Sequence, residues 1–291
     1  MKTRIFAALS IVALSFTTFA SAKPTTQKLP SLASQFKKPL PFDTIPTSRG
    51  VIKITPIIHA SIQIEYRGKV ILVDPISAGN YLKKADVVLI THSHGDHFDP
   101  AAIARICKAN ARVLIPSNAG QYMKRINDAM RVNGTLQRGY AVSSMSNGGQ
   151  TYIDRRLVIA IPAYNIVRGP DAKHKFHPKG AFNGYVLTLG GKRIYIAGDT
   201  EATPEMKALK NIDAAFLPMN LPYTMTPLEA ANAVRAFKPK VVYPYHFRYP
   251  FDKPNTNVQQ FAAALRGSKT DRKSTRLNSS HSTLSRMPSS A

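Results

Sequence analysis

The feature that most constrains the fold of this chain is a string of metal-binding side chains directly after a short apolar run. Residues 91–97 read Thr-His-Ser-His-Gly-Asp-His and follow Val-Val-Leu-Ile at 87–90. The apolar run predicts a buried β-strand, and alternate residues beyond a strand can share a face. The first two histidines can therefore converge on one ion, whereas the last two ligands lie beyond a glycine and can bind a second. The four side chains are His92, His94, Asp96 and His97.

The types of side chain in this string indicate which metals it can bind. Neutral imidazole and carboxylate suit zinc, and also manganese or iron. No cysteine lies in the string, which argues against a closed structural zinc site; a histidine-rich surface loop is the alternative interpretation. The single cysteine, Cys107, is expected to be buried on a helix from Pro100 to Ala109 and cannot form a disulfide within the monomer.

The string resembles the signature of the metallo-β-lactamase superfamily of binuclear metallohydrolases, and two later strand ends match it as well. The apolar segment 193–197 runs into Gly-Asp-Thr at 198–200, a turn typical of the family, and segment 240–245 ends at His246. The resemblance implies that Asp199 bridges the two metals and that His246 is the last ligand. Ligands at three strand ends agree with the rule that α/β sites lie at the carboxyl ends of strands.

The third ligand of the first metal is less direct. Many family members carry a histidine after the strand predicted at 157–162, but this chain has Ala-Tyr-Asn at 163–165. The next histidines are His174 and His177. Small-substrate branches of the family carry a similar Pro-Ala-Tyr-Asn segment followed by His-Pro-Lys-Gly, which is the sequence at 177–180. The resemblance therefore favours His177, and His174, between two lysines, is interpreted as solvated.

The resemblance implies two divalent metal ions as cofactors, zinc with manganese or iron as alternatives. The ions would lower the pKa of a shared water, so that a metal-bridging hydroxide attacks a small ester, lactone or related substrate. Asp96 is the predicted catalytic residue, because it can orient the nucleophile or pass a proton to the leaving group. The predicted ligands are His92, His94, Asp96, His97, His177, Asp199 and His246.

Three further residues near these motifs have other predicted roles. Asp74, at the end of a predicted strand, is expected either to hold the second ring nitrogen of a metal-bound histidine or to be a turn residue. His59 resembles a histidine that related hydrolases place near the pocket without using it as a ligand. Asp99 is interpreted as the N-cap of the helix that begins at Pro100.

The first residues have the pattern of a secretory signal peptide, predicted at 1–22. Basic residues precede an apolar stretch at 5–19, and Ala-Ser-Ala at 20–22 gives a cleavage site. We therefore expect a periplasmic or secreted bacterial protein. No transmembrane span is expected after cleavage, because the apolar stretch is too short for a comfortable span; an uncleaved anchor is the alternative.

Composition sets the remaining predicted boundaries. Residues 23–50 are rich in proline, serine and threonine and are expected to be extended, ahead of a hydrolase domain at 51–270. Residues 271–291 contain seven serines and show no helix or strand period, which predicts disorder. This last segment also resembles a translated sequencing adapter and is interpreted as non-native.

The order of the predicted elements indicates an α/β fold. A glycine pair at 190–191 predicts a hairpin between two strands. Thr-Pro-Leu-Glu at 226–229 predicts a capping box that opens a helix running to Phe237. Periodicity alone supports α/β; the resemblance implies an αββα sandwich, two β-sheets flanked by helices.

The net charge of +24 leaves several substrate classes open. Residues 1–22 contribute +2 and residues 271–291 contribute +3, so the remainder carries +19. Such a field can steer anionic substrates, but there is no convincing nucleic-acid motif. The leading hypothesis is a hydrolase with a small-molecule substrate. The alternatives are a phosphodiesterase or nuclease, and a non-catalytic metal-binding protein of the same fold.

Overall fold

The computed structural model describes residues 40–117, 120–132, 141–247 and 256–272. All of them lie in the second of two units of the chain, residues 36–291. The predicted signal peptide, most of the predicted extended segment and residues 273–291 lie outside the described residues. Among the described residues, no helix has the length and apolar character needed to cross a membrane.

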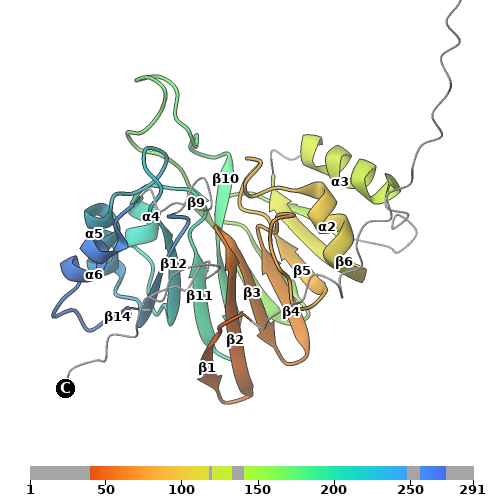
Figure 1. Cartoon of the computed structure of the whole chain (residues 1–291), viewed down its shortest axis with the longest axis horizontal. Coiled ribbons are helices and arrows are strands. Elements are labelled where there is room, and N and C mark those ends of the chain that lie inside the picture. The colour runs from red at the N-terminus through yellow and green to blue at the C-terminus, as the bar shows by residue number, and fades with distance from the viewer. Residues whose placement is uncertain (1–39, 118–119, 133–140, 248–255, 273–291) are drawn as a thin grey trace, which may run out of the picture. The chain divides into compact units, whose positions relative to one another are not determined.

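Two seven-stranded sheets form the centre of this unit (Figure 1), and their strands follow one another in chain order. The first sheet contains β1 (Asp43–Thr47), β2 (Gly50–Ile58), β3 (Ser61–Tyr66), β4 (Lys69–Val73), β5 (Ala85–Leu89), β6 (Cys107–Pro116) and β7 (Ala141–Met145). The second contains β8 (Gln150–Ile153), β9 (Arg156–Ala163), β10 (Phe182–Leu189), β11 (Lys192–Ile196), β12 (Ala214–Pro218), β13 (Val241–Tyr245) and β14 (Asp271–Arg272).

The two sheets share one pattern of strand directions. In each, the first four strands pair antiparallel and the last three join them in parallel. Parallel strands end at the same edge of a sheet, which is where α/β proteins place their sites. The strands that precede the predicted ligands, β5, β11 and β13, all belong to the parallel halves.

Helices cover the outer face of each sheet. On β4 alternate residues face opposite ways, so that Ile71 and Val73 belong to the core between the sheets while Val70 and Leu72 pack in the helix-facing core. The helix-facing core includes residues of α2 (Pro100–Ile106) and α3 (Gly120–Val132). The core that contains Ile71 and Val73 is larger, and it also includes residues of α4 (Pro204–Lys207), α5 (Pro227–Phe237) and α6 (Val258–Ala264). The predicted αββα sandwich is confirmed.

Local signals in the sequence predicted several element boundaries correctly. Asp99 accepts a hydrogen bond from the backbone of α2 as its N-cap, and Thr226 and Glu229 form the capping box of α5. The pair Gly190 and Gly191 joins β10 to β11 with both φ angles positive, at 55° and 80°, as a tight hairpin requires. These turns depend on local chemistry, which a sequence displays directly.

One helix is shorter than predicted. Helix α2 ends at Ile106 instead of Ala109, because the chain from Cys107 onward pairs in parallel with β5 as strand β6. The expected burial of Cys107 is confirmed. Burial raises the pKa of its thiol to about 12, so that this cysteine is not a nucleophile at neutral pH.

Paired strands lie just outside the predicted domain limits of 51 and 270 as well. Asp43–Thr47, inside the segment expected to be extended, pairs antiparallel with β2 as β1. Asp271–Arg272, expected to be disordered, pairs with β13 as β14. Both are edge strands, where backbone pairing does not require an apolar sequence, so composition did not predict them. Strands β7 and β8 and helix α6 were also not predicted.

Candidate metal centre

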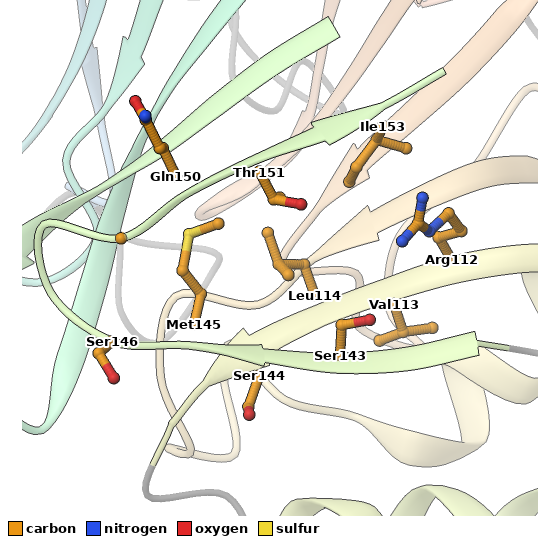
Figure 2. Close-up of a pocket in the computed structure, with 11 residues that line it drawn as sticks. Arg112, Val113, Leu114, Ser143, Ser144, Met145, Ser146, Gln150, Thr151 and Ile153 are labelled. Carbon is orange, nitrogen blue, oxygen red and sulfur yellow. The ribbon is translucent and has the colours of Figure 1, made fainter. Parts of the chain in front are cut away.

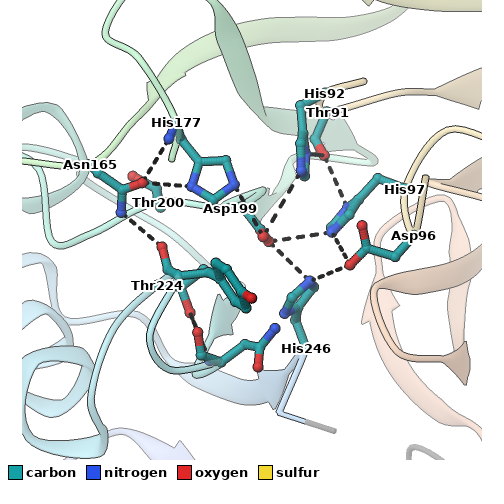
Figure 3. Close-up of polar contacts among 12 residues, drawn as sticks. Thr91, His92, Asp96, His97, Asn165, His177, Asp199, Thr200, Thr224 and His246 are labelled. Atoms are coloured by element: carbon teal, nitrogen blue, oxygen red, sulfur yellow. Dashed lines mark hydrogen bonds and ion pairs between the residues drawn. The ribbon is translucent and has the colours of Figure 1, made fainter. Parts of the chain in front are cut away.

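The predicted ligands come together where strands of the two sheets end. His92 lies three residues beyond β5 in the first sheet, and Asp199 lies three residues beyond β11 in the second. His246 directly follows β13. Their side chains converge around the carboxylate of Asp199 (Figure 3), so the centre lies between the two sheets.

Asp199 presents one carboxylate oxygen to each of two groups of histidines. Its Oδ2 atom lies 4.0 Å from Nε2 of His92 and 3.4 Å from Nε2 of His177. Its Oδ1 atom lies 3.4 Å from Nε2 of His97 and 3.4 Å from Nε2 of His246. A carboxylate placed in this way can bridge two cations.

The side chains form two half-sites, and within each the ligand atoms lie within 4.8 Å of one another. The first half-site consists of His92, His94 and His177. The second half-site consists of Asp96, His97 and His246, with His59 beside them. All seven predicted ligands therefore lie in one cluster around Asp199, and their role as ligands stays a prediction.

His174 lies apart from this cluster. Its side chain is 74% exposed, and its Nδ1 atom lies 2.7 Å from Oδ2 of Asp171. His177, in contrast, is buried among the other histidines. The geometry agrees with the choice of His177 over His174 for the first half-site.

The centre contains buried polar atoms that the protein leaves unsatisfied. Within the described part of the chain, five atoms that face the centre have no hydrogen-bond partner: Nε2 of His92, His97, His177 and His246, and Oδ1 of Asp199. Burying such atoms without partners is costly. Bound cations would satisfy them, and imidazole with carboxylate is a donor set suited to divalent metals. The residues present therefore fit the group that the family implies.

Asp74 orients His97, as predicted. Its Oδ2 atom lies 2.8 Å from Nδ1 of His97, which leaves Nε2 to face the centre. The same carboxylate accepts hydrogen bonds from the backbone N and the side-chain hydroxyl of Thr91, at 2.7 and 2.6 Å. A carboxylate behind a histidine fixes the ring and makes it a stronger ligand.

Asn165 orients His177 in the corresponding way. Its Oδ1 atom accepts a hydrogen bond from the backbone N of His177 at 2.8 Å and lies 2.7 Å from the ring Nδ1. Its Nδ2 atom donates to the carbonyl oxygen of Tyr223 at 2.8 Å. The sequence placed Asn165 only in the segment where many family members carry a histidine. In the structure, these hydrogen bonds bring His177, a predicted ligand twelve residues further along, back to the centre.

Glu201 holds the loop that carries these residues, and sequence reasoning missed it. Its buried carboxylate accepts hydrogen bonds from the backbone N atoms of Ile166, Val167 and Arg168 at 3.1, 3.0 and 2.8 Å. No local motif marks this role, because the donors lie more than thirty residues earlier in the chain. The turn before it is tight: a Cβ at Gly198 would lie 3.0 Å from the carbonyl oxygen of Asn183.

The electrostatics of the two half-sites differ. Burial, helped by the neighbouring His94 and His97, lowers the pKa of His177 to about 3. Burial likewise lowers the pKa of His92 and of His94. Burial also acts on His97, but the carboxylates of Asp199, Asp96 and Asp74 outweigh it and raise the pKa to about 9. The imidazoles of the first half-site are therefore neutral, and His97 holds a proton.

The carboxylates also differ from each other. Burial raises the pKa of Asp199 to about 7, even though His97 acts to lower it. The pKa of Asp96 is lowered, because His97, His246 and His59 outweigh the effect of its burial. Asp96 is thus a stable anion, and the shared Asp199 is the carboxylate that a cation would have to ionise.

His59 lies closer to the ligands than its predicted place near the pocket implied. Its Nε2 atom is 3.0 Å from Oδ2 of Asp96. The contact joins residues 37 positions apart in the chain, and the sequence around each gives no sign of it.

Two cavities among the described residues are lined by side chains other than the predicted ligands. One of about 340 Å³, between β6, β7 and β8, is shown in Figure 2. Its lining includes Arg112, Ser143 and Ser144.

Comparison with known proteins agrees with this site. Residues 53–246 match the beta-lactamase superfamily domain. A UPF0173 metal-dependent hydrolase of Ligilactobacillus salivarius is 35% identical over 218 residues, which cover 71% of this chain and 90% of that protein. A protein of the same name from Thermococcus onnurineus is 32% identical over 209 residues, covering 68% of this chain and 85% of that one.

Solved structures show the same fold. The crystal structure of a protein from Parabacteroides distasonis, which also carries a metal-dependent hydrolase name, is 39% identical with a TM-score of 0.68, covering 81% of this chain and 98% of that one. Igni18, a metallo hydrolase from Ignicoccus hospitalis, is 24% identical with a TM-score of 0.57, covering 76% of this chain and 94% of that one, and shares the fold. The chain belongs to the metallo-β-lactamase superfamily, as a relative of the UPF0173 metal-dependent hydrolases.

Proposed function

We propose that the protein is a binuclear metal-dependent hydrolase of small, neutral ester or lactone substrates. The observation that carries the proposal is the placement of Asp199, whose two oxygens face different groups of histidines. A mononuclear site would not need the second group. Zinc is the first choice of metal, because three histidines with a carboxylate form a common zinc donor set.

Different residues of the chain have different roles in the proposed hydrolysis. Two bound ions would supply a hydroxide near neutral pH and polarise the substrate carbonyl. Asp96 is ionised and about one-fifth of its side chain is exposed, so it can accept a hydrogen bond from the nucleophile and orient it toward the substrate. Asp74 and Asn165 hold His97 and His177 rigid, which keeps the reacting groups in place.

Exposed apolar side chains near the centre support a neutral acyl substrate. Ile166 and Val167 directly follow Asn165, and Leu221 and Tyr223 lie on the loop whose carbonyl Asn165 contacts. These four are half of the eight large apolar residues that are exposed among the described residues. Exposed apolar groups gathered in one place mark binding sites more often than scattered ones do.

Three of the four lysine and arginine side chains on the same loop already have partners. Arg168 contacts Glu201 at 3.2 Å and Glu229 at 2.8 Å, and Lys175 donates to the carbonyl oxygen of Val167 at 2.9 Å. Lys179 lies 3.8 Å from Glu205. A phosphodiester substrate would need cations that are available to bind it.

One group of basic residues lies at the other end of the strands. A cavity of about 530 Å³ is lined by six cationic residues, Lys53, Arg67, Lys69, Lys83, Lys84 and Lys108. Lys69 begins β4 and Lys84 precedes β5, whereas the metal ligands follow the opposite ends of these parallel strands. The positive field therefore does not favour the phosphodiesterase alternative at the metal centre.

A parallel substrate screen tests the proposal. Zinc-loaded protein should hydrolyse γ- and δ-lactones or p-nitrophenyl esters, with little activity on thioesters, bis(p-nitrophenyl) phosphate or a β-lactam. Asp96→Asn should lower kcat by about 100-fold, the cost of misplacing a reacting group by about 1 Å. Faster hydrolysis of the phosphodiester, slowed by added salt, would support the alternative, and inactivity on all substrates with metals bound would favour a non-catalytic protein.

A matched pair of variants tests the apolar surface. Val167→Ser should raise KM for an ester with a long acyl chain more than for an acetate ester. Val51→Ser removes an equally exposed valine on β2 and should change neither value. Equal effects of both variants would contradict a role of Val167 in substrate binding.

A further inference from the structure

His59 occupies an unusual place in the fold. It forms the turn between β2 and β3 together with Ala60, and its backbone has a φ of 52°. This left-handed conformation is uncommon for residues other than glycine, and it is kept only where the surroundings hold it in place. The residue is also 2% exposed, so a polar ring at the tip of a hairpin is buried in the protein.

The contacts of His59 connect two ligands of the second half-site that come from different sheets. Its Nε2 atom lies 3.0 Å from Oδ2 of Asp96, which follows β5 of the first sheet. Its carbonyl oxygen accepts a hydrogen bond from the backbone N of His246, which follows β13 of the second sheet, at 3.2 Å. The two imidazole rings also pack against each other, with centroids 3.8 Å apart.

We propose that His59 is a positioning residue for the second metal: its Nε2–H donates to Oδ2 of Asp96 and holds this carboxylate between His97 and His246. The inference rests on the proposed binuclear function. Oδ2 of Asp96 lies 3.4 Å from Nε2 of His246 and 3.7 Å from Nε2 of His97. Without the donor from His59, this carboxylate would lose a hydrogen bond that fixes its position.

A role as a ligand is the competing explanation, because the Nε2 atom of His59 lies within the same 4.8 Å group. Asp96, His97, His246 and the bridging Asp199 already supply four protein groups to the second ion. Catalytic sites leave a coordination position open for water or substrate. A fifth protein ligand would occupy that position, whereas a hydrogen-bond donor outside the ion leaves it free.

Two substitutions at His59 separate these roles. His59→Gln keeps an N–H donor at a similar reach and removes the imidazole, and His59→Ala removes both. Titration of each variant with Co²⁺ against a competing chelator gives both affinities, and the visible spectrum of bound Co²⁺ reports the ligands. We expect His59→Ala to lower the affinity for the second ion by about 10- to 100-fold, as does the loss of other residues that hydrogen-bond to metal ligands. His59→Gln should retain most of the wild-type affinity and the wild-type spectrum.

Other results would overturn the inference. A changed spectrum together with equal loss in both variants would make His59 a ligand, and wild-type affinity in both would leave it no role at the metal. A double variant, His59→Ala with Asp96→Asn, covers the case in which glutamine fits poorly. If His59 acts through Asp96, then His59→Ala should weaken the second ion much less in the Asp96→Asn background, and a full additive loss would contradict this. A wild-type protein that binds one ion at saturation would instead contradict the proposed binuclear function.

Discussion

The two half-sites of the metal centre share Asp199 but differ in charge. The first half-site uses three imidazoles whose pKa values burial lowers, to about 3 for His177. The second includes the Asp96 carboxylate and His97, whose pKa nearby carboxylates raise to about 9. A metal ion needs a free lone pair on each imidazole. The imidazoles of the first half-site can therefore bind metal without losing a proton, whereas His97 of the second half-site must lose one.

The side chains that orient the predicted ligands also differ in charge between the two half-sites. A neutral amide, Asn165, holds His177 in the first half-site, and a carboxylate, Asp74, holds His97 in the second. Carboxylate behind imidazole increases its basicity, which strengthens the bond to a metal and also the bond to a competing proton. Between the pKa of Asp199, about 7, and that of His97, about 9, the second half-site is therefore the one whose occupancy should respond to pH.

Removing the shared carboxylate should have the largest effect. Asp199→Ala takes one ligand from both half-sites, so we expect loss of both ions and a fall in kcat/KM of more than about 100-fold, beyond the usual cost of losing an outer partner. Metal analysis of the purified variant measures the first, and hydrolysis of the best substrate the second. Retention of two ions would show that Asp199 does not bridge.

Removing a ligand of one half-site should affect that half-site alone. His177→Ala is expected to lower the metal content from two ions to about one per chain, because the first half-site keeps only two imidazoles. His174→Ala is the matched control, since this histidine is exposed and bonds to Asp171; its metal content should equal that of the wild type. The reverse result would move the third ligand to His174.

Changing the pH should separate the half-sites without any substitution. The raised pKa of His97 means that the metal-free protein keeps its proton up to about pH 9. Below that pH each unit should weaken binding of the second ion by about tenfold, since one proton is displaced. Binding of the first ion should be unaffected down to about pH 7, where protonation of the shared Asp199 begins to compete with both ions. Zinc titrations at about pH 7 and about pH 8 measure both affinities, and a parallel change in the two would contradict the assignment.

The same pKa predicts how the stability of the metal-free protein depends on pH. A histidine whose folded pKa lies above its ordinary value, about 6.5, stabilises the fold fully below that value. This contribution is lost as the pH rises through 9. The Tm of the metal-free protein should therefore fall between pH 6.5 and 9. His97→Gln, which cannot be protonated, should reduce this slope.

Substituting the residues that orient the predicted ligands should also distinguish the two half-sites, with smaller effects on metal affinity. Asp74→Asn should weaken the second ion and Asn165→Ala the first, each by about 10- to 100-fold. Asp74→Asn keeps the size of the side chain, so a loss that follows it is due to charge and hydrogen bonding. The contrary outcome, in which each variant weakens both ions equally, would show that the half-sites are mechanically coupled through Asp199.

These contacts also mark what the sequence could predict. The sequence indicated the clustered side chains of His92, Asp199 and His246 as candidate ligands because each directly follows an apolar strand in the chain. The caps at Asp99 and Thr226 were predicted for the same reason. The approach of His59 to Asp96, and of Glu201 to the backbone of Ile166, depends on how two sheets and a long loop pack together. No local pattern encodes these distances, and the edge strands β1 and β14 likewise depend on a partner strand.

The smallest expected effect tests how far the first half-site depends on its surroundings. Glu229, the partner of Thr226 in the capping box of α5, also contacts Arg168 on the loop that carries His177. Thr226→Ala should cost about 1 kcal/mol of unfolding free energy, as other lost caps do, with both metal affinities unchanged, because Glu201 and Asn165 hold the loop independently. Leu228→Ala, at an exposed position of the same helix, should change stability by less than about 0.5 kcal/mol. Chemical denaturation of the metal-loaded protein measures both variants, and a weaker first ion in Thr226→Ala would mean that the loop depends on α5.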